Sequence, residues 1–166
     1  MNRTERDADE VRNLQSLMEL AAIGRRYSAG ETTATETAKQ LSKFVTNEVV
    51  FWSNYTPSWE PLRPLFRERR GVDEILERYA YEHEHERIED GSGVPTDIAV
   101  AGNVAYYSQR ETATFFEHRP VTWEMVTRVR FRDGRMARFE MYLDSAPIEA
   151  VYSSERMGSA TPPQHP

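Results

Sequence analysis

Apolar residues recur at intervals of three and four in three stretches of the chain, the spacing that one face of an α-helix requires. The first stretch spans residues 8–28 and ends before Gly30, a residue suited to a left-handed helix cap. We expect its inward side chains to be Val11, Leu14, Leu17, Met18, Ala21 and Ile23. The second stretch spans about residues 33–44, and Thr33 and Glu36 have the spacing of a capping box.

The third helical stretch follows Gly71 and ends near His83. Its apolar positions are Val72, Ile75, Leu76, Tyr79 and His83. Between these helices and after them, runs of β-branched and aromatic residues predict strands. The expected strands cover residues 48–54, an extended segment from about 85, then 96–100 and 104–116, with a Gly-Ser-Gly turn at 91–93.

Residues 123–144 alternate apolar and polar around Asp133-Gly134, a pattern that predicts a β-hairpin. A two-residue turn there would mix apolar and charged side chains on each face. A three-residue loop, with Gly134 as a G1 bulge and Phe131 opposite Arg135, separates them, so we predict the bulged form. One face then carries Trp123, Met125, Thr127, Val129, Phe131, Ala137, Phe139, Met141 and Leu143, and the other carries Glu124, Arg128, Arg130, Arg138, Glu140, Tyr142 and Asp144.

Three helices followed by antiparallel strands, with one strand between the second and third helices, predict an α+β fold. We expect a cone-shaped, curved antiparallel sheet with the three N-terminal helices packed on its concave face. The domain should span residues 8–152, between a disordered lead-in at 1–7 and a disordered tail at 153–166. Residues 146–152, with proline in the first turn, predict a short terminal helix.

The composition and net charge of the chain exclude several classes of partner and of chemistry. A chain of 166 residues with 39% hydrophobic residues can bury the core of one globular domain. Its net charge of −6, with no basic block, argues against nucleic acid or an anionic membrane as partner. The absence of cysteine excludes disulfides and thiolate chemistry. We see no membrane span and no secretory signal, so we expect a cytoplasmic protein.

Several segments resemble the nuclear transport factor 2-like superfamily and, within it, the SnoaL-like group of polyketide cyclase and ketosteroid isomerase relatives. They are YSAG (27–30), NEVVF (47–51), GVDEI (71–75), FRDGRM (131–136) and YLD (142–144). The resemblance covers residues 8–152 and implies a cystatin-like α+β barrel with a deep pocket, as well as a homodimer. It also implies cofactor-free isomerisation, aldol cyclisation, dehydration or epoxide opening, so we expect no cofactor. His83 and His85 with the adjacent glutamates could suggest a metal site, but a helix-to-strand junction gives no defined geometry, so we expect no metal.

The catalytic acids of these families do not carry over. The ketosteroid isomerase positions fall near Ile23, Ser53 and Thr127, and the cyclase aspartate falls near Met141. Limonene epoxide hydrolase positions fall at Ser108, Arg110 and again Met141. Asp144 matches a common family aspartate, which we expect to cap the terminal segment.

Arg110 is the strongest remaining candidate for a catalytic residue. If residues 117–120 form a short connection, Arg110 faces Thr127, and the cavity-facing row of the long strand is Tyr106, Ser108, Arg110, Thr112 and Thr114. A guanidinium in an apolar pocket is costly unless it meets an anion, so we predict that Arg110 binds a carboxylate or an enolate-like oxygen. A salt bridge to a structural carboxylate, or a register one residue different, would be the structural alternative.

His83 and Tyr55 are the predicted proton-moving groups, because an ordinary histidine titrates near neutral pH. A partly buried structural histidine is the alternative for His83. The predicted substrate-binding residues are Trp52, Trp59, Tyr106, Ser108, Thr112, Trp123, Met125, Thr127, Phe139 and Met141, with Trp59 in a proline-rich loop that could cover the pocket.

The sequence thus favours a cofactor-independent isomerase, cyclase or lyase acting on a lipophilic, polyketide-like or terpenoid-like intermediate. The alternative is a non-catalytic module of the same fold, either ligand-binding or an accessory dimerisation subunit.

Overall fold

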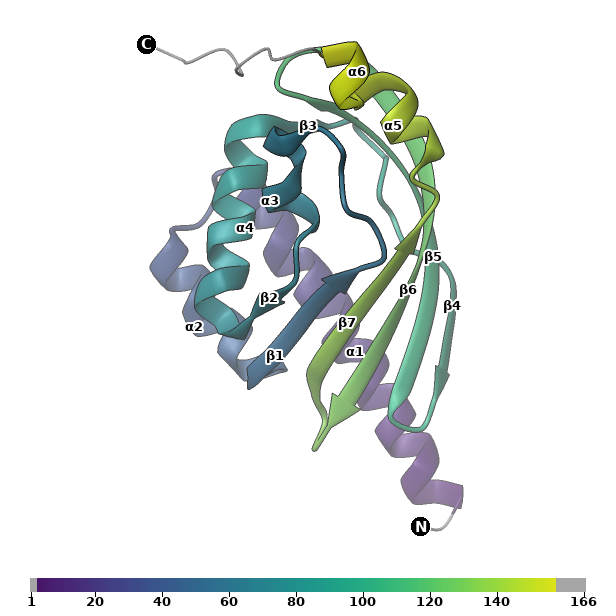
Figure 1. Ribbon diagram of the computed structural model, residues 1–166. Helices are drawn as coiled ribbons and strands as arrows, with labels where there is room; N and C mark the ends of the chain where they lie inside the picture. The colour runs from purple at the N-terminus through teal and green to yellow at the C-terminus, as the bar shows by residue number, and fades with distance from the viewer. Residues whose placement is uncertain (1–2, 158–166) are drawn as a thin grey trace.

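The chain forms one curved sheet with helices on its concave side (Figure 1). The computed structural model describes residues 3–157. In chain order the elements are α1 (Arg3–Ser28), α2 (Ala34–Phe44), β1 (Val45–Ser53), the 3₁₀ helix η1 (Glu60–Leu62), α3 (Arg63–Phe66), β2 (Arg69–Arg70), α4 (Gly71–His85), β3 (Glu86–Ile88), β4 (Thr96–Ala101), β5 (Val104–Phe115), β6 (Pro120–Arg132), β7 (Arg135–Leu143), α5 (Ala146–Tyr152) and α6 (Ser154–Met157).

The sheet has seven strands in the order β2-β1-β7-β6-β5-β3, with β4 also paired to β5. The predicted α+β class is therefore confirmed. The sheet is not antiparallel throughout, because β1 runs parallel to β7, and it remains open rather than closing into a barrel. Within residues 3–157, no helix combines the length and the hydropathy needed to cross a membrane.

The chain ends differ from the predicted boundaries. Helix α1 begins at Arg3, inside the expected lead-in, and α6 lies inside the expected tail. The rest of both predicted segments, residues 1–2 and 158–166, lies outside the described residues. Helix α5 spans Ala146–Tyr152 as predicted. Its N-cap is Ser145, and the carboxylate of the preceding Asp144 accepts the first helical N–H, that of Ala146, at 3.1 Å.

The first two helices show where periodicity works and where it fails. Thr33 and Glu36 form the predicted capping box of α2, and Gly30 takes a left-handed φ of +72° at the end of α1. The buried face of α1 is Asn13, Ser16, Leu17, Leu20 and Ile23. Three expected inward residues, Val11, Leu14 and Met18, are instead exposed. The Asn13 amide donates to the Gly102 carbonyl at 2.9 Å, so a polar residue anchors this face.

The final hairpin has the predicted faces but a different bulge. Asp133 and Gly134 both have positive φ, at 54° and 73°, and form a two-residue turn in which Arg132 pairs with Arg135. The register shifts between Arg130 and Phe131, and this places the extra residue at Ala137. The prediction that Gly134 is the bulge is therefore wrong. Because one extra residue is still present, the apolar face points to the helices as expected, with Trp123, Thr127, Val129, Phe131, Phe139 and Leu143 buried.

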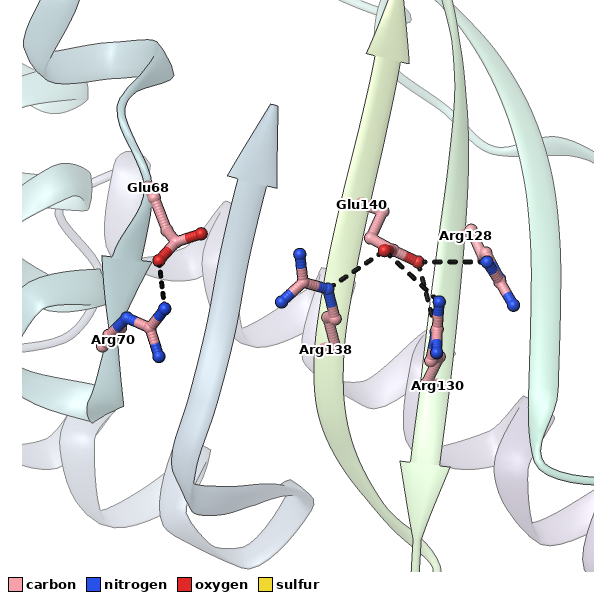
Figure 2. Close-up of polar contacts among 6 residues, drawn as sticks. All are labelled: Glu68, Arg70, Arg128, Arg130, Arg138 and Glu140. Carbon is pink, nitrogen blue, oxygen red and sulfur yellow. Dashed lines mark hydrogen bonds and ion pairs between the residues drawn. The ribbon is translucent and has the colours of Figure 1, made fainter. Parts of the chain in front are cut away.

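The outer face of the sheet is polar at β6 and β7 (Figure 2). There the Glu140 carboxylate, only 7% exposed, meets three guanidinium groups. They belong to Arg128 at 3.5 Å, Arg130 at 3.3 Å and Arg138 at 3.0 Å. A single buried carboxylate therefore organises the charged face that the alternation predicted.

The predicted register between β5 and β6 is wrong. The turn closes earlier than expected, with Phe116 and Glu117 in left-handed conformations (φ of 51° and 58°) and Pro120 already in the strand. Arg110 consequently pairs with Glu124 rather than Thr127, and Glu111 pairs with Trp123. Paired residues share a face, so every side chain of β5 points to the side opposite from the predicted one.

Strands β3 and β4 divide one edge of β5 between them. β3 pairs with residues 113–115 and β4 with residues 104–108. Residues 89–95 connect the two short strands and cross the middle of β5, where the backbone would otherwise be unpaired. This arrangement places the connection beside the cavity described next.

Candidate active site

A cavity of about 790 Å³ lies between the concave face of the sheet and helices α1 and α4. Its apolar wall combines side chains from α1, β1, α3 and the final hairpin. That wall comprises Leu17, Leu20, Phe51, Leu65, Phe66, Trp123, Met125, Phe139, Met141 and Leu143. This volume and lining suit an organic molecule of moderate size.

Six of the residues predicted from the sequence line this cavity. They are His83, Trp123, Met125, Thr127, Phe139 and Met141. His83 lies on α4 and is exposed, and its carbonyl accepts a hydrogen bond from the Arg87 guanidinium at 2.8 Å. Arg25 and Arg87 also line the cavity. The apolar face of the hairpin is thus the cavity wall, as the alternation of its residues predicted.

Four predicted residues on β5 lie on the outer face instead. Arg110 is exposed and pairs with Glu124, and Tyr106 is 44% exposed beneath the Arg128 guanidinium. Ser108 bonds to Thr96 and Asp97, and Thr112 bonds to Thr122 at 2.8 Å. All four were assigned to the cavity because the turn after β5 was expected to be longer.

The three predicted aromatics before α3 also lie outside the cavity. Tyr55 is buried in a second hydrophobic core and donates to the Glu149 carboxylate at 2.6 Å. Burial and that carboxylate raise the pKa of Tyr55. Trp59 stacks on Tyr152 in the same core, so it is not a lid, and Trp52 meets Tyr142 edge-on.

Charged side chains of α4 enter the cavity from the helix side. Arg78 and Glu82 are separated by one helical turn and form an ion pair at 2.5 Å, with both side chains 14% exposed. The Arg78 Nε donates to the Leu65 carbonyl at 2.8 Å, and the guanidinium lies 5.9 Å from the Phe51 ring centre. Arg78 is therefore a positive charge held in a fixed place at the cavity wall.

Glu111 faces Arg78 and Glu82 from the sheet. Its carboxylate accepts one hydrogen bond from the Gln109 amide at 2.9 Å. Burial and, next, the nearby Glu82 raise the pKa of Glu111 from 4.5 to about 7, although Arg78 and the Gln109 hydrogen bond oppose the rise. A carboxyl group with this pKa exists in both protonation states at neutral pH.

A third carboxyl group completes the cluster. Glu86 follows α4 and also lines the cavity. Burial raises its pKa well above the ordinary value, helped by Glu82 and Glu111 and opposed by Arg78. Burial likewise raises the pKa of Glu82, against the effect of Arg78. Among residues 3–157, no three potential ligands are arranged to hold a metal ion.

The sequence contained a signal for this cluster. Arg78 and Glu82 are four residues apart and so share one side of α4, and Glu86 comes four residues later, directly after the helix. That side lies next to the apolar positions Ile75 and Tyr79, which fixed the orientation of the helix. Glu111 could not be found in the same way, because its face depends on the length of the turn after β5.

Most of the chain matches a known protein family. A model of the SnoaL-like domain matches residues 25–139, which span α2 to α4 and most of the sheet. The chain belongs to the SnoaL-like family. No match was found among curated protein sequences.

Solved structures share the fold of this SnoaL-like chain at low sequence identity. A nuclear transport factor 2-like protein from Burkholderia xenovorans LB400 is 16% identical, with a TM-score of 0.68 over 87% of this chain and 98% of its own. A candidate SnoaL-like polyketide cyclase from Jannaschia sp. CCS1 is 13% identical, with a TM-score of 0.63 over 87% and 94%. An epoxide hydrolase from M. tuberculosis is 11% identical, with a TM-score of 0.59 over 86% and 90%.

This SnoaL-like chain has its acids in a different place from those implied by the resemblance. Ser53 and Met141 hold no acid, and Thr127, 1% exposed, is buried in the wall. The ionisable groups come instead from α4, the start of β3 and the middle of β5. Proton transfer beside a fixed positive charge is the chemistry that this arrangement allows.

Proposed function

We propose that this SnoaL-like protein is an enzyme that moves a proton on a lipophilic small molecule, with Glu111 as the proton-transferring group. The reaction classes are isomerisation, cyclisation or elimination next to a carbonyl group. A polyketide-like or terpenoid-like substrate, predicted from the sequence, belongs to this proposal.

The observation that carries the proposal is the position of Glu111. Its carboxyl group stands in a largely apolar cavity, and its pKa of about 7 lies near the working pH of most cells. A general acid or base is most effective when its pKa is near the pH at which it works. Most glutamates are ionised at that pH and are much weaker bases than this one.

Arg78 takes the role first predicted for Arg110. When Glu111 removes a proton from the carbon next to a carbonyl, the electron pair left behind moves onto the oxygen. A fixed positive charge near that oxygen stabilises the enolate-like intermediate. Glu82 holds Arg78 at 2.5 Å, so the guanidinium does not have to move during the reaction. Glu111 then returns the proton at another carbon in an isomerisation.

The apolar wall supplies binding rather than chemistry. Trp123, Met125, Phe139 and Met141 surround the space beside the polar cluster. Burying apolar surface of the ligand there contributes about 25 cal/mol per Å². The expected homodimer stays a prediction, as does the proton-moving role of His83.

Deuterium exchange tests the proposal without knowledge of the natural substrate. Wild-type protein is incubated in D₂O with a panel of hydrophobic ketones and enones, and exchange at the carbon next to the carbonyl is followed by mass spectrometry. We expect exchange with at least one compound, and Glu111→Gln should slow it roughly 10²–10⁴-fold because the base is removed.

Glu124→Gln is the matched control, because Glu124 is exposed on the opposite face of the same sheet and pairs with Arg110. It should keep the wild-type rate. Equal exchange by wild type and Glu111→Gln would contradict the role of Glu111. Binding of panel compounds with no exchange above the buffer rate would favour the non-catalytic ligand-binding module, which the missing family acids also favour.

A further inference from the structure

The connection between β3 and β4 is bonded to β5 on both sides of Glu111. The Glu89 N–H donates to the Thr112 carbonyl at 2.9 Å, and the Gly93 N–H donates to the Arg110 carbonyl at 3.0 Å. Residues 110 and 112 flank Glu111, whose own pairing is with Trp123 on β6. The connection therefore replaces a neighbouring strand at the one place where β5 carries the candidate catalytic acid.

Ser92 adds a side-chain bond to this attachment. Its hydroxyl oxygen accepts the Thr112 N–H at 2.5 Å. The Ser92 N–H itself donates to the Glu89 carbonyl at 3.0 Å, and Gly91 takes a φ of +78° in the turn between them. The turn thus presents the Ser92 hydroxyl to the edge of β5.

Gly93 lies over the Glu111 carboxyl group. A Cβ atom at Gly93 would be 3.2 Å from the Glu111 Oε2 and 3.7 Å from the Gln109 Nε2. Its φ of +66° is a second reason for glycine at this position. The backbone of Gly93 thus lies close to the Glu111 carboxyl group and to the Gln109 amide, and a side chain at this position would crowd both groups.

We propose that Ser92 and Gly93 are positioning residues for Glu111: Ser92 holds the connection against β5, and Gly93 leaves the space in which the carboxyl group meets Gln109. This inference rests on the proposed function for the catalytic meaning of Glu111. The predicted geometric effect on Glu111 does not require a substrate.

Charged and titratable groups reach Glu111 from each element packed around it. Arg78 and Glu82 come from α4, Glu86 from the start of β3 and Tyr107 from β5 itself. The connection adds Glu89 and Asp90, which also line the cavity. Because these groups stay unchanged in the variants below, a shift in the titration of Glu111 reports the connection.

The first test uses the hydroxyl of Ser92. The titration of Glu111 is followed by NMR of its carboxyl carbon, assigned with Glu111→Gln, in the absence of ligand. In Ser92→Ala the connection loosens and water reaches the carboxyl group, so the midpoint should fall by about one pH unit. Exchange of the Thr112 amide hydrogen should become faster. Ser92→Thr keeps a hydroxyl and should restore both values.

Thr96→Ala is the control for Ser92→Ala. It removes another hydroxyl bonded to β5, at Ser108 on the outer face, and should leave the midpoint unchanged. An unchanged midpoint in Ser92→Ala would overturn the role of Ser92.

The second test compares two glycines that differ in one respect. Gly91 and Gly93 both have positive φ, but a Cβ at Gly91 meets nothing within 4 Å. Alanine at either position therefore costs similar backbone strain, and only Gly93→Ala presses on the carboxyl group. Loss of the Gln109 hydrogen bond in Gly93→Ala should raise the midpoint by roughly half a pH unit, whereas Gly91→Ala should not move it. Equal shifts in both would overturn the role of Gly93.

These results separate the two proposals. A titration that moves as expected in a protein without deuterium exchange supports the positioning role and contradicts the enzyme. Exchange that depends on Glu111, with a titration insensitive to both Ser92→Ala and Gly93→Ala, supports the enzyme and contradicts the positioning role. In an active protein, the pH profile of exchange should shift with the titration midpoint, which a purely structural role would not produce.

Discussion

At the scale of single residues, Glu111 links the protonation of the cavity to the stability of the fold. Its carboxyl group has an ordinary pKa of 4.5 in the unfolded chain and about 7 in the folded one. Between these values the folded protein keeps a proton that the unfolded chain has lost. The contribution of Glu111 to the free energy of unfolding is therefore fully present below about pH 4.5 and is lost as the pH rises through 7. Above that pH the contribution does not change further.

Glu111→Gln should remove this dependence, because an amide of the same shape carries no charge. We expect the variant to be more stable than wild type by about 1–3 kcal/mol at pH 8 and equal to it at pH 4.5. Urea unfolding at the two pH values measures the difference. Glu124→Gln should change neither value, and a variant less stable than wild type at pH 8 would show that the ionised carboxylate stabilises the fold.

Residue-level prediction from sequence succeeded where a side chain follows from a local pattern and failed where it depends on a distant turn. The capping pair Thr33 and Glu36 follows from spacing alone. The choice between Arg110 and Glu111 as the cavity residue depends on whether the turn after β5 is odd or even in length. That length is set by Phe116 and Glu117, whose backbones are in the left-handed conformation. Phenylalanine and glutamate rarely adopt this conformation, so the sequence does not predict it.

At the scale of elements, one buried side chain of α5 is hydrogen-bonded to the end of β5. The hydroxyl of Tyr152, a residue that is 0% exposed, accepts the Phe115 N–H at 3.0 Å and also meets the carbonyls of Phe115 and Arg119. Tyr152 thereby satisfies the backbone at the end of β5, where the chain leaves the ladder for the turn. This contact joins the burial of Ile148 in holding the short helix against the second core.

Tyr152→Phe should destabilise the protein by about 1–3 kcal/mol, since the buried Phe115 N–H loses its partner. Urea unfolding gives the change in stability, and faster exchange of the Phe115 amide hydrogen gives its location. Tyr106→Phe removes a hydroxyl from an exposed ring and should have little effect. A loss spread evenly over all amides would place the effect of Tyr152 elsewhere than at this strand end.

Elements were easier to predict than their partners. Helical periodicity and alternation located α1, α2, α4, α5 and the long strands, because each pattern is local. The parallel pairing of β1 with β7 joins segments about ninety residues apart, and no local pattern specifies it. The short elements η1 and α3 were hidden by Pro57, Pro61 and Pro64, which predicted an irregular loop although proline also suits the first turn of a helix.

At the scale of the molecule, the cavity has more acids than bases, within a chain of net charge −6. Glu82, Glu86 and Glu111 share it with Arg78, which is already bonded to Glu82 and the Leu65 carbonyl. A second anion placed beside these three carboxyl groups would meet like charges at short range, and the guanidinium among them is already engaged. The other two arginines that line the cavity are Arg25 and Arg87. The cavity should therefore prefer uncharged ligands to carboxylates.

A matched pair of ligands tests this preference. At pH 8 and low salt, 3-phenylpropanamide should bind at least about tenfold more tightly than 3-phenylpropanoate, a difference of roughly 1.4 kcal/mol. Isothermal titration calorimetry measures both constants. The gap should narrow at pH 6, where Glu111 is mostly protonated. Tighter binding of the carboxylate would contradict this preference and mean that an arginine of the cavity, Arg25, Arg78 or Arg87, pairs with the anion.

Because β3 and β4 pair separately with β5, the connection between them, residues 89–95, can be replaced without changing either strand. Each short strand keeps its own ladder with β5, and none of the side chains at 89–95 is buried. Laboratory evolution limited to these seven residues would remodel one wall of the cavity and change the pKa of Glu111 while leaving both cores intact. New specificities are therefore to be sought first in libraries of this segment, grafted onto an unaltered scaffold.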